Sequence, residues 1–382
     1  MNCVKREILP VGQGAFYLET LMLRENEYKV IYDCGSATDV IYVETQIKAS
    51  LNKDEEINAV FISHLDDDHV NGLEFLLKHC NVKNLFFPLI TKQTKQFNAI
   101  RNLINPQSRF LTQFINSEGN SIRELEGGSE VQLHPISEDA SNDNRVIEVT
   151  QAIFGAGVEV DWVYLPHNFR ERERYQNFIS NIVEINSKLS NGGILDDDKI
   201  DLEKLKNLWR KGTAQDKKFI KKAYEDIEGT LNINSMTLYS GTKHAFCCRC
   251  CHRFYCRYDW ECLIRSRNER NLALNGCLYT GDYDLGRTAT AQKWQSIYSV
   301  YEEYFPNIGL VQIPHHGSKH NYNSKLRDVT EYAVYFASAG LKNSYGHPHK
   351  EVMQDLCSYG RIFNCITEDV HSKMTYITRW CD

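Results

Sequence analysis

The segment Ser63–Gly72, which reads Ser-His-Leu-Asp-Asp-Asp-His-Val-Asn-Gly, limits the possible folds of this chain more than any other. It directly follows Ile57–Ile62, an apolar run of the length of a buried strand. Four side chains of types that bind metal ions stand within it: His64, Asp66, Asp68 and His69. A polar loop at a strand end can turn the first two toward one ion and the last two toward another. Two divalent ions about 4 Å apart polarise a shared substrate oxygen and lower the pKa of a bridging water.

A calcium-binding loop is the first alternative for this segment. Such a loop carries acids at alternate positions, glycine at the sixth position and glutamate at the twelfth. Counted from Asp66, the fifth and sixth positions are Val70 and Asn71, and counted from Asp67 the twelfth is Lys78. Both registers fail, so the segment does not match a calcium loop. The second alternative is an acidic loop exposed to solvent with no ligand.

Three later segments each place a further ligand-type side chain after a predicted strand. They are Asp282, the pair His315 and His316, and His134. Each has a structural alternative, because a Gly-Asp pair can be a turn and a single histidine such as His134 is equally often a structural residue. Open α/β sheets collect their ligands at the carboxyl ends of the strands. The coincidence of all these groups at strand ends therefore predicts one shared site.

The order of elements predicts a layered α/β protein. The first forty residues read as strands and turns, and strands then alternate with helices in both halves of the chain. Two segments interrupt this order. Residues 138–228 are rich in charge with apolar residues at helical spacing, which predicts a helical insertion, and residues 243–270 are dense in cysteine, arginine and aromatic residues. The predicted catalytic domain therefore comprises residues 1–137 and 229–382.

Composition and charge bear on the cellular compartment of the protein and on the partners it can bind. The 382 residues include 13 cysteines and carry a formal net charge of −6. No apolar run is long enough for a membrane span, and Met1–Pro10 lacks the apolar core of a signal peptide. Because many cysteines in a chain without an export signal indicate a reducing compartment, we expect a cytoplasmic protein. The mild acidity argues against nucleic-acid binding by the whole surface.

The cysteine-rich insertion supports two predictions. The spacing of Cys247 with Cys250, and of Cys248 with Cys251, matches the paired ligands of a structural zinc site. The candidate ligands are Cys247, Cys248, Cys250, Cys251, Cys256 and Cys262. Arginines such as Arg253 and Arg257 are interleaved with aromatic residues, a composition typical of a nucleic-acid surface. A hairpin with unligated thiols and a solvated charged face are the alternatives.

Eight short segments together resemble the metallo-β-lactamase fold, and within it the branch that contains the nuclease-like domain of ComEC-type DNA-uptake proteins. They are Val11–Gly14, Ile31–Gly35, His64–Gly72, Leu133–Pro135, Asn234–Ser235, Thr280–Asp282, Pro314–Ser318 and Tyr345–Pro348. They occur in the family's order and lie outside the two insertions. The resemblance implies a four-layer αβ/βα sandwich with metal ions at one edge. It is weakly specific for the substrate, because one fold hosts many activities.

The resemblance also implies a dinuclear site. Its ligands would be His64, Asp66 and His134 at site one, Asp68, His69 and one of His315 or His316 at site two, and Asp282 between the two ions. Adjacent residues at a strand end point in different directions, so we expect only one of His315 and His316 to be a ligand. The other histidine and Ser318 would lie near the substrate. His347 resembles the late histidine that the family places near the scissile group.

Asp66 stands where the commoner form of this segment has histidine. A carboxylate adds a hard oxygen ligand, so Mn²⁺ suits the site about as well as Zn²⁺. The charge of two divalent ions is balanced by Asp66, Asp68 and Asp282 together with one hydroxide. Such a site suits phosphoryl oxygens, because the ions can hold them from both sides.

These observations predict a metal-dependent hydrolase, namely a phosphodiesterase or nuclease that acts on nucleic acid or nucleotides through a hydroxide bridging two Zn²⁺ or Mn²⁺ ions. Asp68, His347 and Ser318 are the predicted catalytic residues, and His347 would assist the leaving group. The alternatives are a hydrolase of another ester, amide or lactone, and a regulatory subunit that docks a protein partner through its insertions. Such insertions would suit a nucleic-acid-processing or antiviral defence system.

Overall fold

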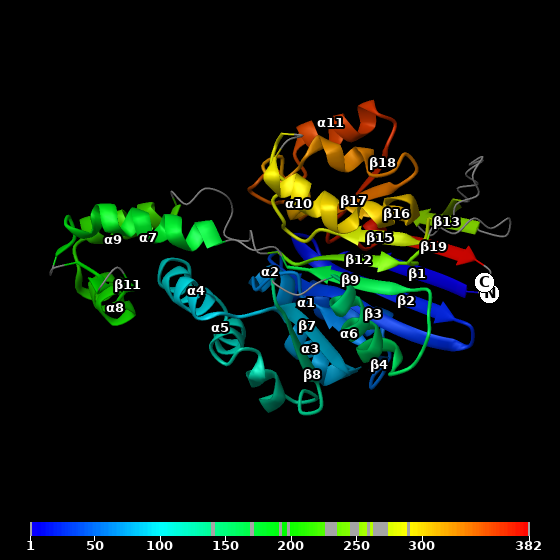
Figure 1. Cartoon of the computed structure of the whole chain (residues 1–382), viewed down its shortest axis with the longest axis horizontal. Helices are drawn as coiled ribbons and strands as arrows, with labels where there is room; N and C mark the ends of the chain where they lie inside the picture. The colour runs from blue at the N-terminus through cyan, green and yellow to red at the C-terminus, as the bar shows by residue number, and fades with distance from the viewer. Residues whose placement is uncertain are drawn as a thin grey trace.

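In the computed structural model two β-sheets pack face to face and helices cover their outer faces, which makes four layers (Figure 1). The structure describes residues 2–138, 142–168, 172–190, 193–196, 199–225, 235–244, 252–257, 260–262, 274–288 and 291–380. This arrangement confirms the predicted four-layer α/β sandwich. Among the described residues no helix combines the length and the apolar character that crossing a bilayer requires.

The first sheet has nine strands. Their order is β14 (Trp260–Cys262), β13 (His252–Arg257), β19 (Met374–Trp380), β1 (Asn2–Ile8), β2 (Gly14–Leu23), β3 (Asn26–Ser36), β5 (Ala59–Phe61), β7 (Asn84–Pro88) and β8 (Gln132–Ile136). Pairing is antiparallel from β14 to β3 and parallel from β3 to β8. The parallel part carries the carboxyl end of β5 to the same edge as those of its neighbours.

The second sheet has six strands. Their order is β18 (Ile362–Ile366), β17 (Val334–Ser338), β16 (Ile308–Gln312), β15 (Gly276–Tyr279), β12 (Thr237–Gly241) and β9 (Val163–His167). The four strands from β18 to β15 are parallel, whereas β12 is antiparallel to both of its neighbours. Two further pairs are small: β4 (Glu56–Ile57) with β6 (Asn81–Val82), and β10 (Leu195–Asp196) with β11 (Lys199–Ile200).

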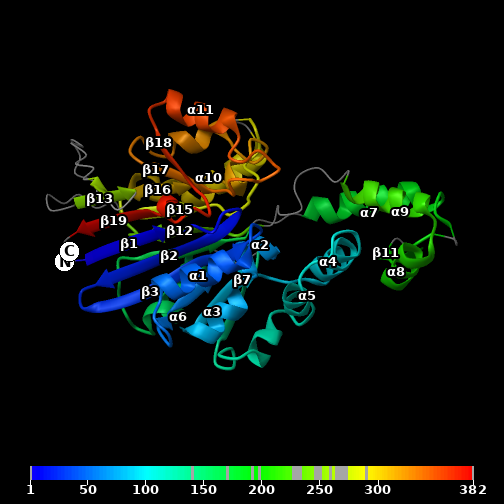
Figure 2. The same cartoon turned by 180° about the vertical axis from the view of Figure 1, so that it is seen from behind.

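Helices supply the two outer layers. The nine-stranded sheet is covered by α1 (Val40–Ser50), α3 (Leu73–His79) and α5 (Arg109–Asn116), and the six-stranded sheet by α10 (Gln292–Tyr301) and α11 (Lys350–Ser358) (Figure 2). The layer between the sheets is aromatic, with Tyr17 and Tyr32 stacked against Tyr279. Burial of these apolar faces on both sides of each sheet stabilises the sandwich and fixes the relative position of its strand ends.

The structure divides the predicted helical insertion, residues 138–228, into two parts. Its first part belongs to the sandwich: α6 (Asn142–Phe154) packs beside β9, and β9 is the edge strand of the second sheet. The charge-rich sequence around Val163–His167 concealed this short buried strand. The second part forms a separate cluster of helices, α7 (Arg172–Asn186), α8 (Leu202–Lys211) and α9 (Ala214–Glu225), which we call the helical lobe.

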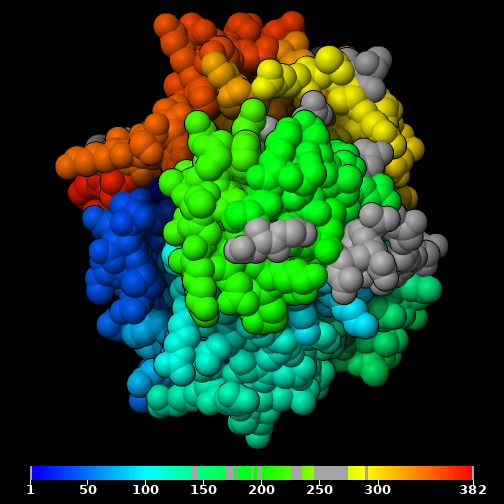
Figure 3. Space-filling model, turned by 90° about the vertical axis from the view of Figure 1, so that its left-hand side faces the viewer, coloured from blue at the N-terminus to red at the C-terminus, as the bar shows by residue number. Residues whose placement is uncertain are grey.

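The helical lobe projects from one end of the sandwich, and Figure 3 looks onto it. It contacts the sandwich through α4 (Lys92–Ile104), whose Ile100 is fully buried among the apolar side chains of the lobe. A capping box at Thr91 and Thr94 fixes the start of α4. The helix α4 therefore connects the lobe to the loops at this end of the sheets.

The predicted cysteine-rich insertion contributes β13 and β14 to the nine-stranded sheet, since β13 pairs with β19. Of the candidate zinc ligands, Cys247, Cys248, Cys250 and Cys251 lie outside the described residues, and for Cys256 and Cys262 only the backbone is described. The side chains of Arg253 and Arg257 likewise lie outside the description. The structural zinc site and the nucleic-acid surface in this insertion stay predictions.

Candidate metal centre

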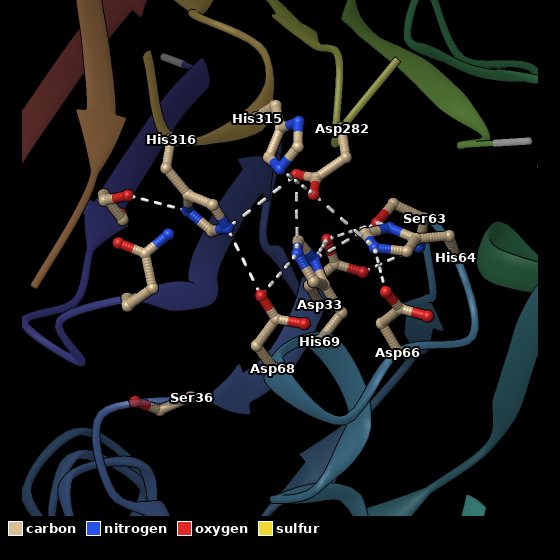
Figure 4. Close-up of polar contacts among 12 residues, drawn as sticks. Asp33, Ser36, Ser63, His64, Asp66, Asp68, His69, Asp282, His315 and His316 are labelled. Carbon is tan, nitrogen blue, oxygen red and sulfur yellow. Dashed lines mark hydrogen bonds and ion pairs between the residues drawn. The ribbon is translucent and has the colours of Figure 1, made fainter. Parts of the chain in front are cut away.

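The predicted ligands other than His134 meet where the carboxyl ends of strands from both sheets face one another (Figure 4). The segment Ser63–Gly72 leaves β5 and forms the short helix α2 (Asp67–Val70). Asp282 follows β15, and His315 and His316 follow β16 in the short 3-10 helix η4 (His315–Gly317). A hydrogen bond from Met236 N to Ser63 O joins the two sheets at this edge.

The close approach of β3 to α2 explains the glycine at position 35. A Cβ atom on Gly35 would lie 2.5 Å from the carbonyl carbon of Asp68 and 2.6 Å from the nitrogen of His69. Both distances are far inside van der Waals contact, so only glycine lets the strand support the loop. The loop is further tied down by the hydrogen bond from Gly72 N to Cys34 O.

One group of ligand atoms is compact. His69 Nε2 lies 3.5 Å from Asp282 Oδ1 and 3.7 Å from Asp68 Oδ2. His316 Nε2 lies 3.3 Å from Asp68 Oδ2 and 3.9 Å from Asp282 Oδ1. Ligands about 2.1 Å from a tetrahedral ion are about 3.4 Å apart. We call these four side chains the Asp68 half; three of them, His69, Asp282 and His316, form one compact metal-ligand group within the described residues.

Three other predicted ligands lie at similar distances, on the side of the second oxygen of Asp282. His64 Nε2 lies 3.7 Å from Asp282 Oδ2, and His315 Nε2 lies 3.6 Å from the same oxygen. Asp66 Oδ2 lies 3.8 Å from His64 Nε2. We call His64, Asp66 and His315 the His64 half. Among the described residues Asp66 does not share a compact metal-ligand group with any other side chain, whereas His64 groups with Asp68 and His69.

Asp66 is instead paired with a residue that the sequence did not indicate. Arg101, on α4, donates from Nη2 to Asp66 Oδ2 at 2.9 Å and from Nη1 to Asp66 Oδ1. This two-point contact between a guanidinium and a carboxylate is one of the strongest hydrogen-bonded ion pairs in proteins. Both oxygens of Asp66 are therefore occupied by a fixed positive charge.

All four histidines hold their Nδ1 atoms in hydrogen bonds. His69 Nδ1 lies 2.8 Å from Asp33 Oδ2, His316 Nδ1 2.8 Å from Ser338 O, His315 Nδ1 3.0 Å from Asn321 Oδ1 and His64 Nδ1 2.9 Å from Ser63 Oγ. Because oxygen atoms accept these bonds, Nδ1 carries a proton, and Nε2 is the nitrogen that each ring can offer to a metal ion. The buried Nε2 atoms of His64 and His69 have no hydrogen-bond partner among the described residues. This donor set fits divalent metal ions.

Asp33 is a further functional residue that the sequence analysis did not assign. Its fully buried carboxylate accepts hydrogen bonds from Ser63 N at 2.6 Å, Ser63 Oγ at 2.7 Å and His69 Nδ1. A carboxylate behind a metal-binding histidine fixes the orientation of the ring and raises its basicity. The signal was the Asp33-Cys34-Gly35 sequence that closes β3, which the resemblance included without a role.

The electrostatics of the Asp68 half favour a cation. Burial lowers the pKa of His69, but the carboxylates of Asp33, Asp68 and Asp282 outweigh burial and raise this pKa to about 10. Burial raises the pKa of Asp68, yet His69 and His316 bring it below its ordinary value. The carboxylates therefore stay ionised in a buried site, where unbalanced negative charge is costly. A divalent ion would balance that charge.

The left-handed backbone at His315 and His316 determines where the two rings point. Both residues have positive φ, 49° and 56°, and Gly317 follows with φ 84°. Because left-handed residues interrupt the alternation of a strand, both rings face Asp282, one toward each of its oxygens. Within the described residues His316 belongs to a compact metal-ligand group and His315 does not, so the expectation that only one of the two is a ligand stays a prediction. Left-handed non-glycine residues are strained, and such strain is concentrated at functional sites.

His134 is not brought to the cluster. Its Nε2 donates to Asn84 Oδ1 at 2.9 Å, and its ring stacks on Phe86 with centroids 4.5 Å apart. The position opposite Phe86 in the β7–β8 pair directs the ring onto the neighbouring strand. The sequence had placed His134 with His64, whereas in the structure His64 and His315 both lie near Asp282 Oδ2.

The two remaining predicted catalytic residues differ in their surroundings. Ser318 is buried, and its Oγ accepts a hydrogen bond from His320 N at 3.2 Å, so it supports the turn after η4. His347 lies beside the cluster, with its ring centroid 5.4 Å from that of His315 and 6.2 Å from that of His316. Its buried Nδ1 has no hydrogen-bond partner among the described residues. Burial and the charges of His315 and His316 lower the pKa of His347 to about 3, so its ring is neutral near pH 7.

Residues 18–136 match the sequence model of the Metallo-beta-lactamase superfamily. Solved structures similar to the chain include the metallo-β-lactamase SMB-1 bound to 2-mercaptoethanesulfonate, with 8% identity over 85% of both chains and a TM-score of 0.28. A putative metallo-β-lactamase from Thermotoga maritima shares 13% identity over 53% of this chain and 90% of its own, with a TM-score of 0.24. A HARLDQ-motif mutant of a metallo-β-lactamase from Cronobacter sakazakii shares 8% identity over 79% of this chain and 74% of its own, with a TM-score of 0.26.

No curated protein sequence matches the chain. The matched segment runs from β2 through β8 and contains the ligand-bearing loop Ser63–Gly72. Together with the four-layer sandwich, the matched segment agrees with the metallo-β-lactamase fold that the sequence predicted. The narrower resemblance to the nuclease-like domain of ComEC-type proteins stays a prediction.

Proposed function

We propose that the protein is a metal-dependent phosphodiesterase that acts on nucleic acid or nucleotides. The observation that carries this proposal is the convergence of Asp68, His69, Asp282 and His316, whose facing carboxylate oxygens and Nε2 atoms lie 3.3–3.9 Å apart. These residues would hold a divalent ion, and such an ion would polarise a phosphoryl oxygen and lower the pKa of a water molecule. The carboxylates make the set hard, which favours Mn²⁺ or Zn²⁺ and oxygen-rich substrates.

The surrounding residues have distinct roles in this proposal. Asp33 holds the His69 ring in the orientation that presents Nε2. Ser338 and Asn321 do the same for His316 and His315 through their oxygens. His347 is a neutral ring at the edge of the cluster, so its Nδ1 can form a hydrogen bond with the leaving-group oxygen of a substrate.

The charge of the helical lobe supports a polyanionic substrate. Residues 202–225, which form α8 and α9, contain eight basic residues and three acidic ones, in a chain whose net charge is −6. The basic residues are Lys204, Lys206, Arg210, Lys211, Lys217, Lys218, Lys221 and Lys222, and the acidic ones are Glu203, Asp216 and Glu225. Lys218, Lys221 and Lys222 are exposed on one face of α9. A basic face on an acidic protein is the electrostatic signature of a nucleic-acid surface.

An activity panel tests this proposal. The purified chain is assayed with bis-p-nitrophenyl phosphate, single-stranded DNA, duplex DNA, RNA, a cyclic nucleotide, a β-lactam and a lactone, separately with Mn²⁺, Zn²⁺ and Mg²⁺. We expect turnover of phosphodiesters and its loss in Asp68→Asn. Turnover of only the lactam or the lactone would replace the proposed substrate class. A folded protein without turnover of any compound would favour the regulatory-subunit alternative.

A further inference from the structure

The pairing of Arg101 with Asp66 makes the two halves of the metal centre unequal. Arg101 reaches Asp66 from α4, 35 residues further along the chain, and contacts both carboxylate oxygens. The two side chains are largely enclosed, with 17% of Arg101 and 8% of Asp66 exposed. A guanidinium in this position supplies the positive charge that a metal ion would otherwise supply to Asp66.

The charge balance around Asp282 also indicates that the two halves of the metal centre are unequal. With Asp66 paired to Arg101, the carboxylates whose oxygens face the Nε2 atoms of the cluster are Asp68 and Asp282. One divalent ion would balance these two charges, and the Asp33 carboxylate behind them is paired with the His69 ring. The distances agree, because Asp68, His69, Asp282 and His316 each belong to a compact metal-ligand group and Asp66 belongs to none within the described residues.

The helical lobe holds Arg101 in place. The neighbouring residue on α4, Ile100, is fully buried in the apolar cluster of the lobe together with Leu205 of α8 and Ile182 of α7. Asn102, on the other side of Arg101, donates to Thr112 Oγ1 of α5 at 3.1 Å. The position of the guanidinium is therefore set by packing between the lobe and the sandwich, and not by the loop that carries the ligands.

We propose that Arg101 takes the place of a second cation at Asp66, so that one ion binds tightly in the Asp68 half and a second binds the His64 half only when Arg101 leaves Asp66. The inference rests on the metal-binding part of the proposed function. It replaces the symmetric two-ion site that the sequence predicted with sequential, unequal loading. In this proposal the helical lobe, which holds α4, also controls whether a second ion binds in the His64 half.

Metal-binding stoichiometry tests the proposal without any substrate. The metal-free, full-length chain is titrated with Mn²⁺ by calorimetry, and bound ions are counted by equilibrium dialysis and elemental analysis. We expect wild type to bind one ion tightly and a second at least about tenfold more weakly. Arg101→Met should tighten the second ion by at least about tenfold and leave the first unchanged. Lys95→Met is the matched control, because Lys95 lies on the same helix and pairs with Glu118.

Two further variants keep the test decisive if Arg101→Met does not fold. Arg101→Lys keeps the charge without the two-point contact and should give an intermediate affinity for the second ion. Asp66→Asn should remove the second ion and keep the first. Two ions of equal affinity in wild type, or an unchanged second affinity in the Arg101 variants, would overturn the proposal. Unequal loading without phosphodiester turnover would overturn only the proposed function, whereas the absence of any tight ion would overturn both.

Discussion

The two halves of the metal centre share Asp282 and the loop Ser63–Gly72. Each half also has one aspartate of its own from this loop, Asp68 or Asp66, and these two aspartates contact different partners. Asp68 faces the Nε2 atoms of His69 and His316, whereas Asp66 faces a guanidinium. Both aspartates are ligand types at similar positions of one loop. The comparison shows that the residue type provides a possible ligand, and that the nearest cation in the folded protein decides whether the ligand is available to a metal ion.

The largest expected effect comes from removing the charge of Asp68. Asp68→Asn should lower the turnover of bis-p-nitrophenyl phosphate about 10³-fold, because a polarising ion contributes several kcal/mol to the transition state and 1.36 kcal/mol is tenfold. Steady-state kinetics at saturating Mn²⁺ measures the loss, and circular dichroism checks that the fold is kept. If Asp66→Asn lost as much as Asp68→Asn, the two halves would be equivalent and the comparison would fail.

Removing the support behind His69 should have the next largest effect. Asp33→Asn should weaken metal binding in the Asp68 half by about 10- to 100-fold, because the residue behind a metal-binding histidine orients the ring and raises its basicity. Competition with a fluorescent chelator measures the affinity. Asp39→Asn serves as control, since Asp39 caps α1 through Ile41 N and should affect stability without changing metal affinity. Equal affinities for the two variants would remove Asp33 from the site.

Charge reversal on the lobe should separate substrate binding from metal binding. Lys218→Glu, Lys221→Glu and Lys222→Glu together should raise KM for DNA about tenfold or more, and reduce the salt dependence of binding by about one unit of slope per lost phosphate contact. Turnover of bis-p-nitrophenyl phosphate and occupancy of the Asp68 half should not change, because this small substrate does not reach the lobe.

The control for the lobe variant is an equal change of charge on the sandwich. Lys53→Glu, Lys78→Glu and Lys83→Glu alter three exposed lysines near the β4–β6 pair. If both triple variants bind DNA equally well, the basic face of α9 is a solvated surface and the lobe acts only through Arg101.

The smallest effect on activity is expected at His134. His134→Phe should change the turnover by less than about threefold, because the ring stacks on Phe86 away from the cluster, but it should cost about 1–3 kcal/mol of stability by leaving Asn84 Oδ1 without its donor. Thermal unfolding and kinetics on one preparation measure both. If His134→Phe lost as much turnover as His315→Asn, His134 would belong to the His64 half.

Much of the Asp68 half could be predicted from the sequence. Asp68 and His69 stand in one short loop after a buried strand, and Asp282 and His316 end later strands, so the rule that strand ends of a layered α/β fold share an edge brings them together. His134 followed the same rule and was misplaced. The rule gives the edge at which a residue lies and leaves open which way its side chain turns, and in β8 the ring turns toward Phe86.

The sequence by itself determined the fold class, the ligand-bearing loop and the chemistry of its side chains, because these depend on residues close together in the chain and on regular alternation along strands. Only the tertiary structure decided that His315 and His316 both face Asp282, that Asp33 supports His69, and that Arg101 occupies Asp66. Each of these depends on backbone direction at a turn or on contacts between distant segments. Coulomb attraction depends on the distance between charges in space and not on their separation in sequence. Arg101 lies 35 positions after Asp66, and the two side chains are in contact because α4 packs between the lobe and the sandwich.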